Sequence, residues 1–175
     1  MSSDFKKIYI IGQDYSFGQV VSDTSIALLR EKRPDIEIVG NEFHPIGQVK
    51  DFTPYVTKIV SSDADAVITG NFGADMVSLA RSIIDSGLDI PIYTFYAAYD
   101  GITATLGADG VNKIYLVHND AGNPIPTEER LAYTRNFKRL NPNNDMTQFR
   151  ITNALQMLGP AREASQSTEA YDIAL

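Results

Sequence analysis

The sequence predicts an α/β fold: a three-layer, Rossmann-like open parallel sheet of about five strands, with helices on both faces. The run Ile8–Ile11 is rich in β-branched residues and uninterrupted, which is typical of a strand buried on both faces. Further strand-like runs begin near residues 36, 66, 92 and 113. The spacing of the early runs suits the roughly 30 residues of a βαβ unit. Because such crossovers are right-handed, they predict a parallel sheet covered by helices.

Each expected element has its own local signal. Gly18 allows a tight turn into a helix, and Pro34 ends that helix. Gly87 is the residue expected directly after the helix at Ala74–Ser86. In chain order we expect a strand at 8–11, a helix from about Gly18 to Lys32, a strand from Ile36 to Gly40–Asn41, a helix capped by Thr53 and running to about Ser62, a strand at Ala66–Ile68, a helix at Ala74–Ser86, a strand at Ile92–Phe95, a helical turn at Thr103–Leu106 and a strand at Lys113–Val117.

The segment Ala121–Pro126 is rich in Gly, Asn and Pro and is the best candidate for a boundary. We therefore expect an α/β lobe over residues 1–120 and a helical extension over 121–175. Thr127 is expected to cap the first helix of the extension, and Gly159–Pro160 to break or kink the second, over 149–164. The extension's apolar side chains need a partner surface, and their exposure would drive self-association. They are Leu131, Phe137, Leu140 and Leu155.

Composition excludes several classes of function. The 175 residues are 43% hydrophobic and 21% charged, as expected for a chain with a core. A formal charge of −7 argues against a nucleic-acid partner. No cysteine is present, so disulfides, thiolate metal sites and thiol nucleophiles are absent. No apolar run approaches the ~20 residues of a membrane helix. Residues 1–7 lack the apolar core of a signal peptide, so the chain is either cytosolic or part of a longer one.

Motifs for catalysis are also missing. The loop between Gly12 and Gly18 has the wrong length for a phosphate loop and lacks its Lys–Ser/Thr ending. No strand is followed by a dinucleotide fingerprint, and no Ser or Thr lies in a nucleophile elbow. The only histidines are His44 and His118, both expected in loops, where a solvated surface role is the commoner one. We therefore expect a binding protein with no catalytic residue, metal or cofactor; a small α/β enzyme using Asp14 or His118 is a distant alternative.

Large aromatic side chains follow three of the expected strands, at the edge where an open α/β sheet binds its ligand. Exposing several of them together is costly unless something covers them. They therefore favour the wall of a pocket for an apolar or aromatic group, with a few polar side chains to orient it. The candidate ligand-binding residues are Asp14, Tyr15, Ser16, Phe17, Asn71, Phe72, Tyr96, Tyr99 and Asp100.

Four stretches resemble the C-terminal lobe of the type I periplasmic substrate-binding proteins of the leucine/isoleucine/valine-binding family. They read KKIYIIGQDYSFGQ, RPDIEIVGNEFHPIGQVKDFTPYVTKI, ADAVITGNFGADM and GLDIPIYTFYAAYDG, and together they cover most of residues 6–117. Proteins of this family trap a ligand between two α/β lobes and deliver it to an ABC importer. The resemblance implies that the first lobe and signal peptide lie outside this sequence, that the extension packs on the missing lobe, and that the protein is periplasmic or extracytoplasmic.

The resemblance also suggests roles for individual residues. Tyr15 or Phe17, together with Phe72, correspond to positions that stack on or flank the ligand side chain. Members that bind amino acids carry an acid at the tip of the fourth strand, where this chain has Ala97–Ala98, with Asp100 a little beyond. The implied function is solute binding for an ABC permease, with an apolar or aromatic amino acid or a related carboxylate as ligand. The effector-binding lobe of a sensor or transcriptional regulator of the same fold is the alternative.

Overall fold

The computed structural model describes residues 4–97, 102–117, 127–143 and 149–171. The chain divides into two compact units, one built mainly from the residues up to His118 and one from the residues that follow. Each unit is considered by itself. Among the described residues, no helix combines the length and the apolar character needed to cross a membrane.

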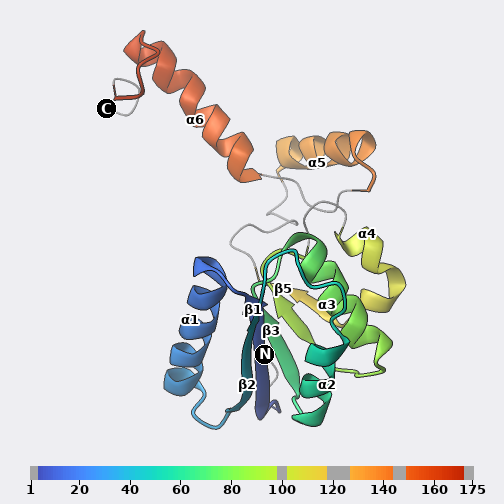
Figure 1. Ribbon diagram of the computed structural model, residues 1–175. Helices are drawn as coiled ribbons and strands as arrows, with labels where there is room; N and C mark the ends of the chain where they lie inside the picture. The colour runs from blue at the N-terminus through green and yellow to red at the C-terminus, as the bar shows by residue number, and fades with distance from the viewer. Residues whose placement is uncertain (1–3, 98–101, 118–126, 144–148, 172–175) are drawn as a thin grey trace. The chain divides into compact units, whose positions relative to one another are not determined.

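The first unit is built on a five-stranded sheet in which every pair of neighbouring strands is parallel, as the sequence predicts. The strand order is β2-β1-β3-β4-β5 (Figure 1). The strands are β1 (Lys7–Gln13), β2 (Glu37–His44), β3 (Ala66–Thr69), β4 (Ile92–Thr94) and β5 (Ile114–Leu116). The first strand of the sequence is therefore at the interior of the sheet, between β2 and β3.

The helices lie on both faces of this sheet (Figure 1). The chain crosses from β1 to β2 in one direction and then from β2 past β1 to β3 in the other. Since both crossovers are right-handed, the first helix lies on one face and the later ones lie on the opposite face. The helices are α1 (Ser16–Lys32), α2 (Thr53–Ser61), α3 (Gly73–Asp85) and α4 (Ile102–Leu106), the last followed by a 3-10 helix, η1 (Gly107–Gly110).

Alternate residues of β1 supply the two halves of the core. Ile8 and Ile10 pack against α1, whereas Tyr9 and Ile11 pack on the side of α2 and α3. All of them are at most 4% exposed, which confirms the prediction of a strand buried on both faces. This double burial fixes the register of β1, because a slip by one residue would exchange the two faces.

The predicted end of the second strand at Gly40–Asn41 is wrong, because β2 continues to His44 in register with the last residue of β1, Gln13. Gly40 does not end the strand; it makes room for Tyr9. A Cβ at residue 40 would lie 2.2 Å from the Tyr9 ring. Because β2 continues, His44 lies in the core and not in the predicted loop, and it is fully buried.

Two helix starts also differ from the prediction. Helix α1 begins at Ser16, two residues early, and Thr53 is the first residue of α2 instead of its cap. The Asp51 carboxylate accepts a hydrogen bond from the Thr53 N–H at 2.9 Å and so satisfies a donor of the first turn from outside the helix. Gly87 takes a φ of 79° directly after the C-cap of α3, as predicted.

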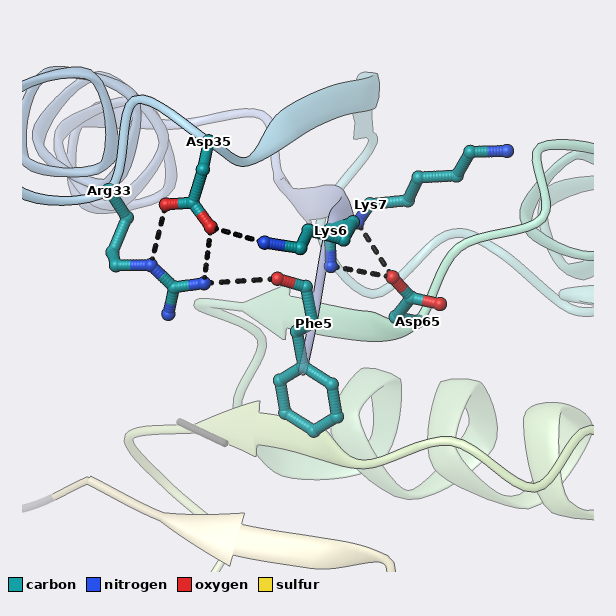
Figure 2. A network of polar contacts seen from close by, with 6 residues as sticks. All are labelled: Phe5, Lys6, Lys7, Arg33, Asp35 and Asp65. Atoms are coloured by element: carbon teal, nitrogen blue, oxygen red, sulfur yellow. Dashed lines mark hydrogen bonds and ion pairs between the residues drawn. The ribbon is translucent and has the colours of Figure 1, made fainter. Parts of the chain in front are cut away.

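A charged network joins the beginnings of three strands, at the edge opposite the helix N-termini (Figure 2). The Asp65 carboxylate accepts the backbone N–H groups of Lys6 and Lys7 at 2.7 and 2.8 Å. Asp35 pairs with the Lys6 ammonium and with the Arg33 guanidinium, which also donates to the Phe5 carbonyl. The network fixes the start of β1 relative to the segments that enter β2 and β3.

The second unit contains two helices, α5 (Glu128–Leu140) and α6 (Phe149–Ser165). The predicted break in the second helix is wrong, since α6 continues through Pro160. Gly159 precedes this proline, and its missing Cβ removes one of the clashes that a proline ring makes with the preceding residue. Several apolar side chains of the unit are exposed, among them Leu140 at 61% and Leu155 at 63%.

Candidate functional site

The order of the strands defines where a ligand should bind. From β1 the chain proceeds to β2 on one side and, later, to β3 on the other, so the carboxyl ends of β1 and β3 flank the point where the topology reverses. In open α/β sheets, ligands bind in the crevice at this switch point. Tyr15 and Phe17 follow β1, and Phe72 follows β3. The rings that follow β1 and the ring that follows β3 therefore lie at the switch point, where an open α/β sheet forms its binding crevice.

The structure brings four of the nine predicted residues together. Tyr15 lies 6.0 Å from Phe72 and 6.2 Å from Phe17 between ring centroids. Tyr96, which follows β4, lies 5.4 Å from Phe17 and 6.1 Å from Phe72. Each ring thus contacts two others, mostly edge to face, a geometry that aromatic pairs favour. We call Tyr15, Phe17, Phe72 and Tyr96 the aromatic cluster.

The cluster is accessible from solvent. Phe72 is 40% exposed, and the other three rings are half-buried. Burial raises the pKa of the Tyr15 phenol, and the neighbouring Tyr96 adds to this shift. The Tyr15 phenol therefore stays neutral at physiological pH and adds uncharged aromatic surface to the cluster.

Two helices begin at the aromatic cluster without a side-chain cap. Tyr15 is the N-cap of α1 and Phe72 is the N-cap of α3, both with extended backbone and neither with a capping hydrogen bond from its side chain. The first N–H groups of a helix have no partner within the helix, and the helix dipole adds partial positive charge there. The site therefore combines apolar rings with two helix ends that favour a negatively charged group.

The remaining predicted residues have different surroundings. Asn71 is fully buried, and its side chain contacts the His44 imidazole. Asp14 is exposed and accepts a hydrogen bond from the Gln19 amide, and Ser16 is exposed on the first turn of α1. Tyr99, Asp100 and His118 lie outside the described residues.

A layer of buried polar side chains lies at the carboxyl ends of the strands, and the sequence did not reveal it. The Gln13 amide donates to Asp75 at 2.7 Å, and the same carboxylate oxygen accepts the Gly47 N–H at 2.8 Å. Asp75 thereby joins the end of β1, the first turn of α3 and the loop before α2. The side-chain amide oxygen of Gln13, Oε1, is buried and, within the described part of the chain, has no hydrogen-bond partner.

The expectation that His44 is a solvated surface group is wrong. Its ring lies 4.9 Å from Phe52 and 5.7 Å from Tyr55, both at steep angles. Nδ1 faces the Pro45 carbonyl at 3.2 Å, and Nε2 lies 2.8 Å from Asn71 Nδ2. No group of three or more His, Asp or Glu residues able to hold a metal ion occurs among the described residues.

Comparison with known proteins identifies the family. The model of the periplasmic binding protein family matches residues 1–174. A Leu/Ile/Val-binding protein homologue of Brucella abortus is 27% identical over 135 residues, which are 77% of this chain and 32% of the relative. Among solved structures, the leucine-, isoleucine-, valine-, threonine- and alanine-binding protein of Brucella ovis aligns with a TM-score of 0.75 at 26% identity, covering 97% of this chain and 44% of its own.

A second solved structure shares the fold at lower identity. The isoleucine complex of the branched-chain amino acid transporter substrate-binding protein of Streptococcus pneumoniae aligns with a TM-score of 0.79 at 16% identity, covering 97% of this chain and 47% of its own. The chain thus spans about a third of the curated relative's length and less than half of each solved chain. On the evidence of the family match over nearly its whole length and of the parallel five-stranded lobe, this chain belongs to the periplasmic binding protein family.

Proposed function

We propose that this chain is the ligand-binding lobe of an extracytoplasmic solute-binding protein that serves an ABC importer, and that its ligand is an apolar or aromatic amino acid or a related carboxylate. The observation that carries the proposal is the aromatic cluster, in which rings from the ends of three strands contact one another at the switch point of the sheet. The proposed role is capture and delivery of a ligand without chemical change.

The rings favour an apolar or aromatic ligand group. Phe72 is 40% exposed although its neighbours are large rings, so a flat or branched apolar group could cover it and remove that surface from water. An additional ring would meet Tyr15, Phe17 and Tyr96 at the angles that these rings already take with one another. An inorganic ion would gain little from such a wall.

The helix ends favour a carboxylate on the same ligand. Helices α1 and α3 start at the cluster with uncapped N-termini, and α1 has no acidic residue in its first turn. A carboxylate placed there would accept N–H groups that lack partners within the helices. Asp75 in the first turn of α3 does not oppose this, because it is buried against Gln13 and Gly47.

The described residues do not require an amino group on the ligand. Ala97, which follows β4 where the resemblance expects an acid, is buried and apolar. Asp14, the exposed acid near the cluster, accepts a hydrogen bond from Gln19. A benzoate-like or branched aliphatic acid therefore fits the described residues as well as leucine or phenylalanine does. The Brucella relatives at 26–27% identity, named for leucine, isoleucine and valine, keep amino acids within the proposal.

We propose residues 1–120 as the binding lobe and residues 121–175 as an extension that packs on a second lobe. The exposed apolar side chains of the extension support this division, since Leu140 and Leu155 would be covered by such a contact. In the complete protein the second lobe would supply the other wall of the site, and the permease would receive the ligand on opening.

Isothermal titration calorimetry and ligand-observed NMR test the proposal with leucine, isoleucine, phenylalanine, tyrosine, benzoate and 4-hydroxybenzoate as probes. Binding that Phe72→Ala abolishes and Val20→Ala leaves unchanged would support it. Val20 is the matched control because it is an exposed apolar residue of α1, 59% accessible, in none of the ring contacts. Binding that survives Phe72→Ala would place the site elsewhere and refute the proposal.

A further inference from the structure

The four rings of the aromatic cluster contact one another in a closed loop. Each ring contacts the next in the order Tyr15, Phe17, Tyr96, Phe72 and back to Tyr15. The centroid distances along the loop are 6.2, 5.4, 6.1 and 6.0 Å in that order. The planes of neighbouring rings meet at 39°, 61°, 70° and 68°. The rings are therefore arranged around a common centre and do not form a stack.

A group at the common centre of the loop would lie close to all four rings. Four centroids joined by sides of this length lie, on average, at most about 4 Å from their common centre, whatever the shape of the loop. The face of an aromatic ring attracts a cation that lies within about 6 Å of the ring centroid. The centre of the loop is therefore a place where several rings can attract one cation together.

The loop favours a rounded group over a flat one. A flat ring gains most from offset stacking or edge contact with one or two neighbouring rings. A compact group that has apolar surface on every side can contact all four rings at once. An ammonium nitrogen that carries three methyl groups has this shape, and enclosure by several aromatic rings is a common way in which proteins bind such a group.

A quaternary ammonium also suits the residue that follows β4. A primary ammonium has three N–H donors that need acceptors, and the resemblance therefore expects an acid there. This chain has Ala97 at about that place, and its side chain is apolar and only 1% exposed. A quaternary ammonium has no N–H, so it needs no acceptor at this position. The aromatic rings would then hold the positive charge that an acid holds in the amino-acid binders.

We propose that the aromatic cluster is a cage for a quaternary ammonium group, and that the ligand is an N-trimethylated amino acid, which is a betaine. This inference rests on the proposed function, from which it takes the carboxylate of the ligand, and it specifies the other end of the same molecule. The carboxylate is needed because the N-terminal ends of α1 and α3 carry partial positive charge and disfavour a cation alone. The ligand is bound intact, without the making or breaking of a bond.

The walls of the cage come from three segments and support one another. Tyr15 and Phe17 lie at the start of α1, Phe72 is the N-cap of α3, and Tyr96 follows β4. Phe17 also packs edge to face on Phe95, with 6.3 Å between centroids and 88° between planes. Because the rings already contact one another without a ligand, binding requires little further ordering of their side chains.

Two ligands of the same shape test the role of the positive charge. N,N,N-Trimethylglycine and 3,3-dimethylbutanoate share the carboxylate and the three methyl groups, but the central atom is a charged nitrogen in the first and a neutral carbon in the second. Ligand-observed NMR with the 175-residue chain should show about tenfold tighter binding of the betaine, with its methyl resonance shifted upfield by the surrounding rings. Choline, which lacks the carboxylate, should bind more weakly than the betaine. Equal affinity for the two isosteric ligands would overturn the proposal.

Substitutions by leucine test whether the rings themselves hold the charge. Tyr96→Leu and Phe72→Leu each keep an apolar side chain but remove one aromatic face, so each should reduce the preference for the betaine over its neutral isostere several-fold. Circular dichroism checks that each variant is folded. The matched control is Tyr115→Leu, because Tyr115 is a 44% exposed ring of the same lobe that contacts Tyr93 and lies outside the cluster. A preference that survives both cluster variants would place the cation elsewhere and refute the proposal.

The ligand panel separates this inference from the proposed function. Binding of leucine, phenylalanine or benzoate that depends on Phe72, without binding of the betaine, would refute the cage and leave the proposed function standing. Absence of binding by every carboxylate at millimolar concentration would refute both. A tenfold preference for the betaine that the cluster variants reduce and Tyr115→Leu does not would support both.

Discussion

His44 and Asn71 are joined by their side chains across β1, an interior strand of the sheet, with 2.8 Å between Nε2 of the imidazole and Nδ2 of the carboxamide. His44 ends β2, and Asn71 follows β3, with β1 between these strands. Since Nδ1 faces the Pro45 carbonyl, it carries the proton, and Nε2 accepts the hydrogen bond from Asn71. The next residue after Asn71 is Phe72, so this bond supports the end of β3 that presents a ring of the aromatic cluster.

Removing one member of this pair should destabilise the lobe more than removing both. His44→Leu leaves the Asn71 amide buried without its acceptor, which should cost about 2 kcal/mol. The double variant His44→Leu/Asn71→Leu removes donor and acceptor together. Urea unfolding of both single variants and the double variant gives the coupling energy. Additive losses would show that the side chains do not interact.

Gly18→Ala should destabilise the lobe by roughly 2 kcal/mol or more, since a Cβ there would lie 2.0 Å from the Gln13 carbonyl oxygen. The obstacle is backbone of β1, so the only relief is a shift of α1 or of the end of β1. Gly12→Ala is the control: it lies in the same lobe, but the nearest atom that a Cβ there would meet, on Gly18, is 3.7 Å away, an ordinary van der Waals contact. Thermal unfolding should show a loss for the first variant and no loss for the second.

Acid should weaken the network at the beginnings of the strands. Hydrogen bonds from Arg33 and Lys6 lower the pKa of Asp35, and the backbone N–H groups of Lys6 and Lys7 lower that of Asp65. Because the folded-state pKa values lie below the ordinary value near 4, these carboxylates stabilise the fold above that pH, and the contribution is lost as pH falls below it. Asp65→Asn should flatten the acid limb of a plot of unfolding midpoint against pH. Asp23→Asn, at an exposed position on α1, should leave it unchanged.

At high pH Tyr9 should lose its phenol proton later than an ordinary tyrosine. Burial and a hydrogen bond to Glu42 raise the pKa of Tyr9 to about 12. A raised pKa means that the neutral phenol stabilises the fold below its ordinary value near 10, and that this contribution is lost as pH rises toward 12. Absorbance titration at the phenolate band should contain one late component. Its persistence in Tyr9→Phe would assign it to another residue.

The 175-residue chain alone should bind its ligand weakly. If a closed pair of lobes holds a ligand at ~1 μM, about −8 kcal/mol, one wall that keeps half of the contacts leaves binding weaker than ~1 mM, because the ligand still loses most of its motional freedom. Ligand-observed NMR is suited to this range. Micromolar binding by the chain would show that one lobe forms a complete site.

The sequence predicted the parts of the fold that depend on local pattern. The run Ile8–Ile11 predicts a strand buried on both faces. The rings at residues 15, 17, 72 and 96 follow strands that the βαβ spacing predicts to be parallel. Their convergence follows from topology alone. The buried layer could not be predicted in this way, because Gln13 and Asp75 are separated by 62 residues and either would be unremarkable on a surface.

The errors share one physical cause, which is pairing between distant segments. Gly40 resembles a strand end locally, but in the sheet it accommodates Tyr9 and the strand continues. His44 then occupies the core because β1 pairs with β2 up to that residue. The contact between the side chains of Asn71 and His44 could not be predicted for the same reason, because it depends on the register of two strands; Asn71 itself stays a predicted ligand contact.

The position of β1 has a consequence for how the chain folds during synthesis. Strand β1 is made first, and both of its neighbours in the sheet, β2 and β3, follow by Thr69. A nascent chain of residues 7–69 therefore contains three adjacent strands, which can pair while α3 and the later strands are still being made. We expect pulsed hydrogen exchange to protect the amides of β1 and β3 before those of β4, with β5 the last strand to become ordered.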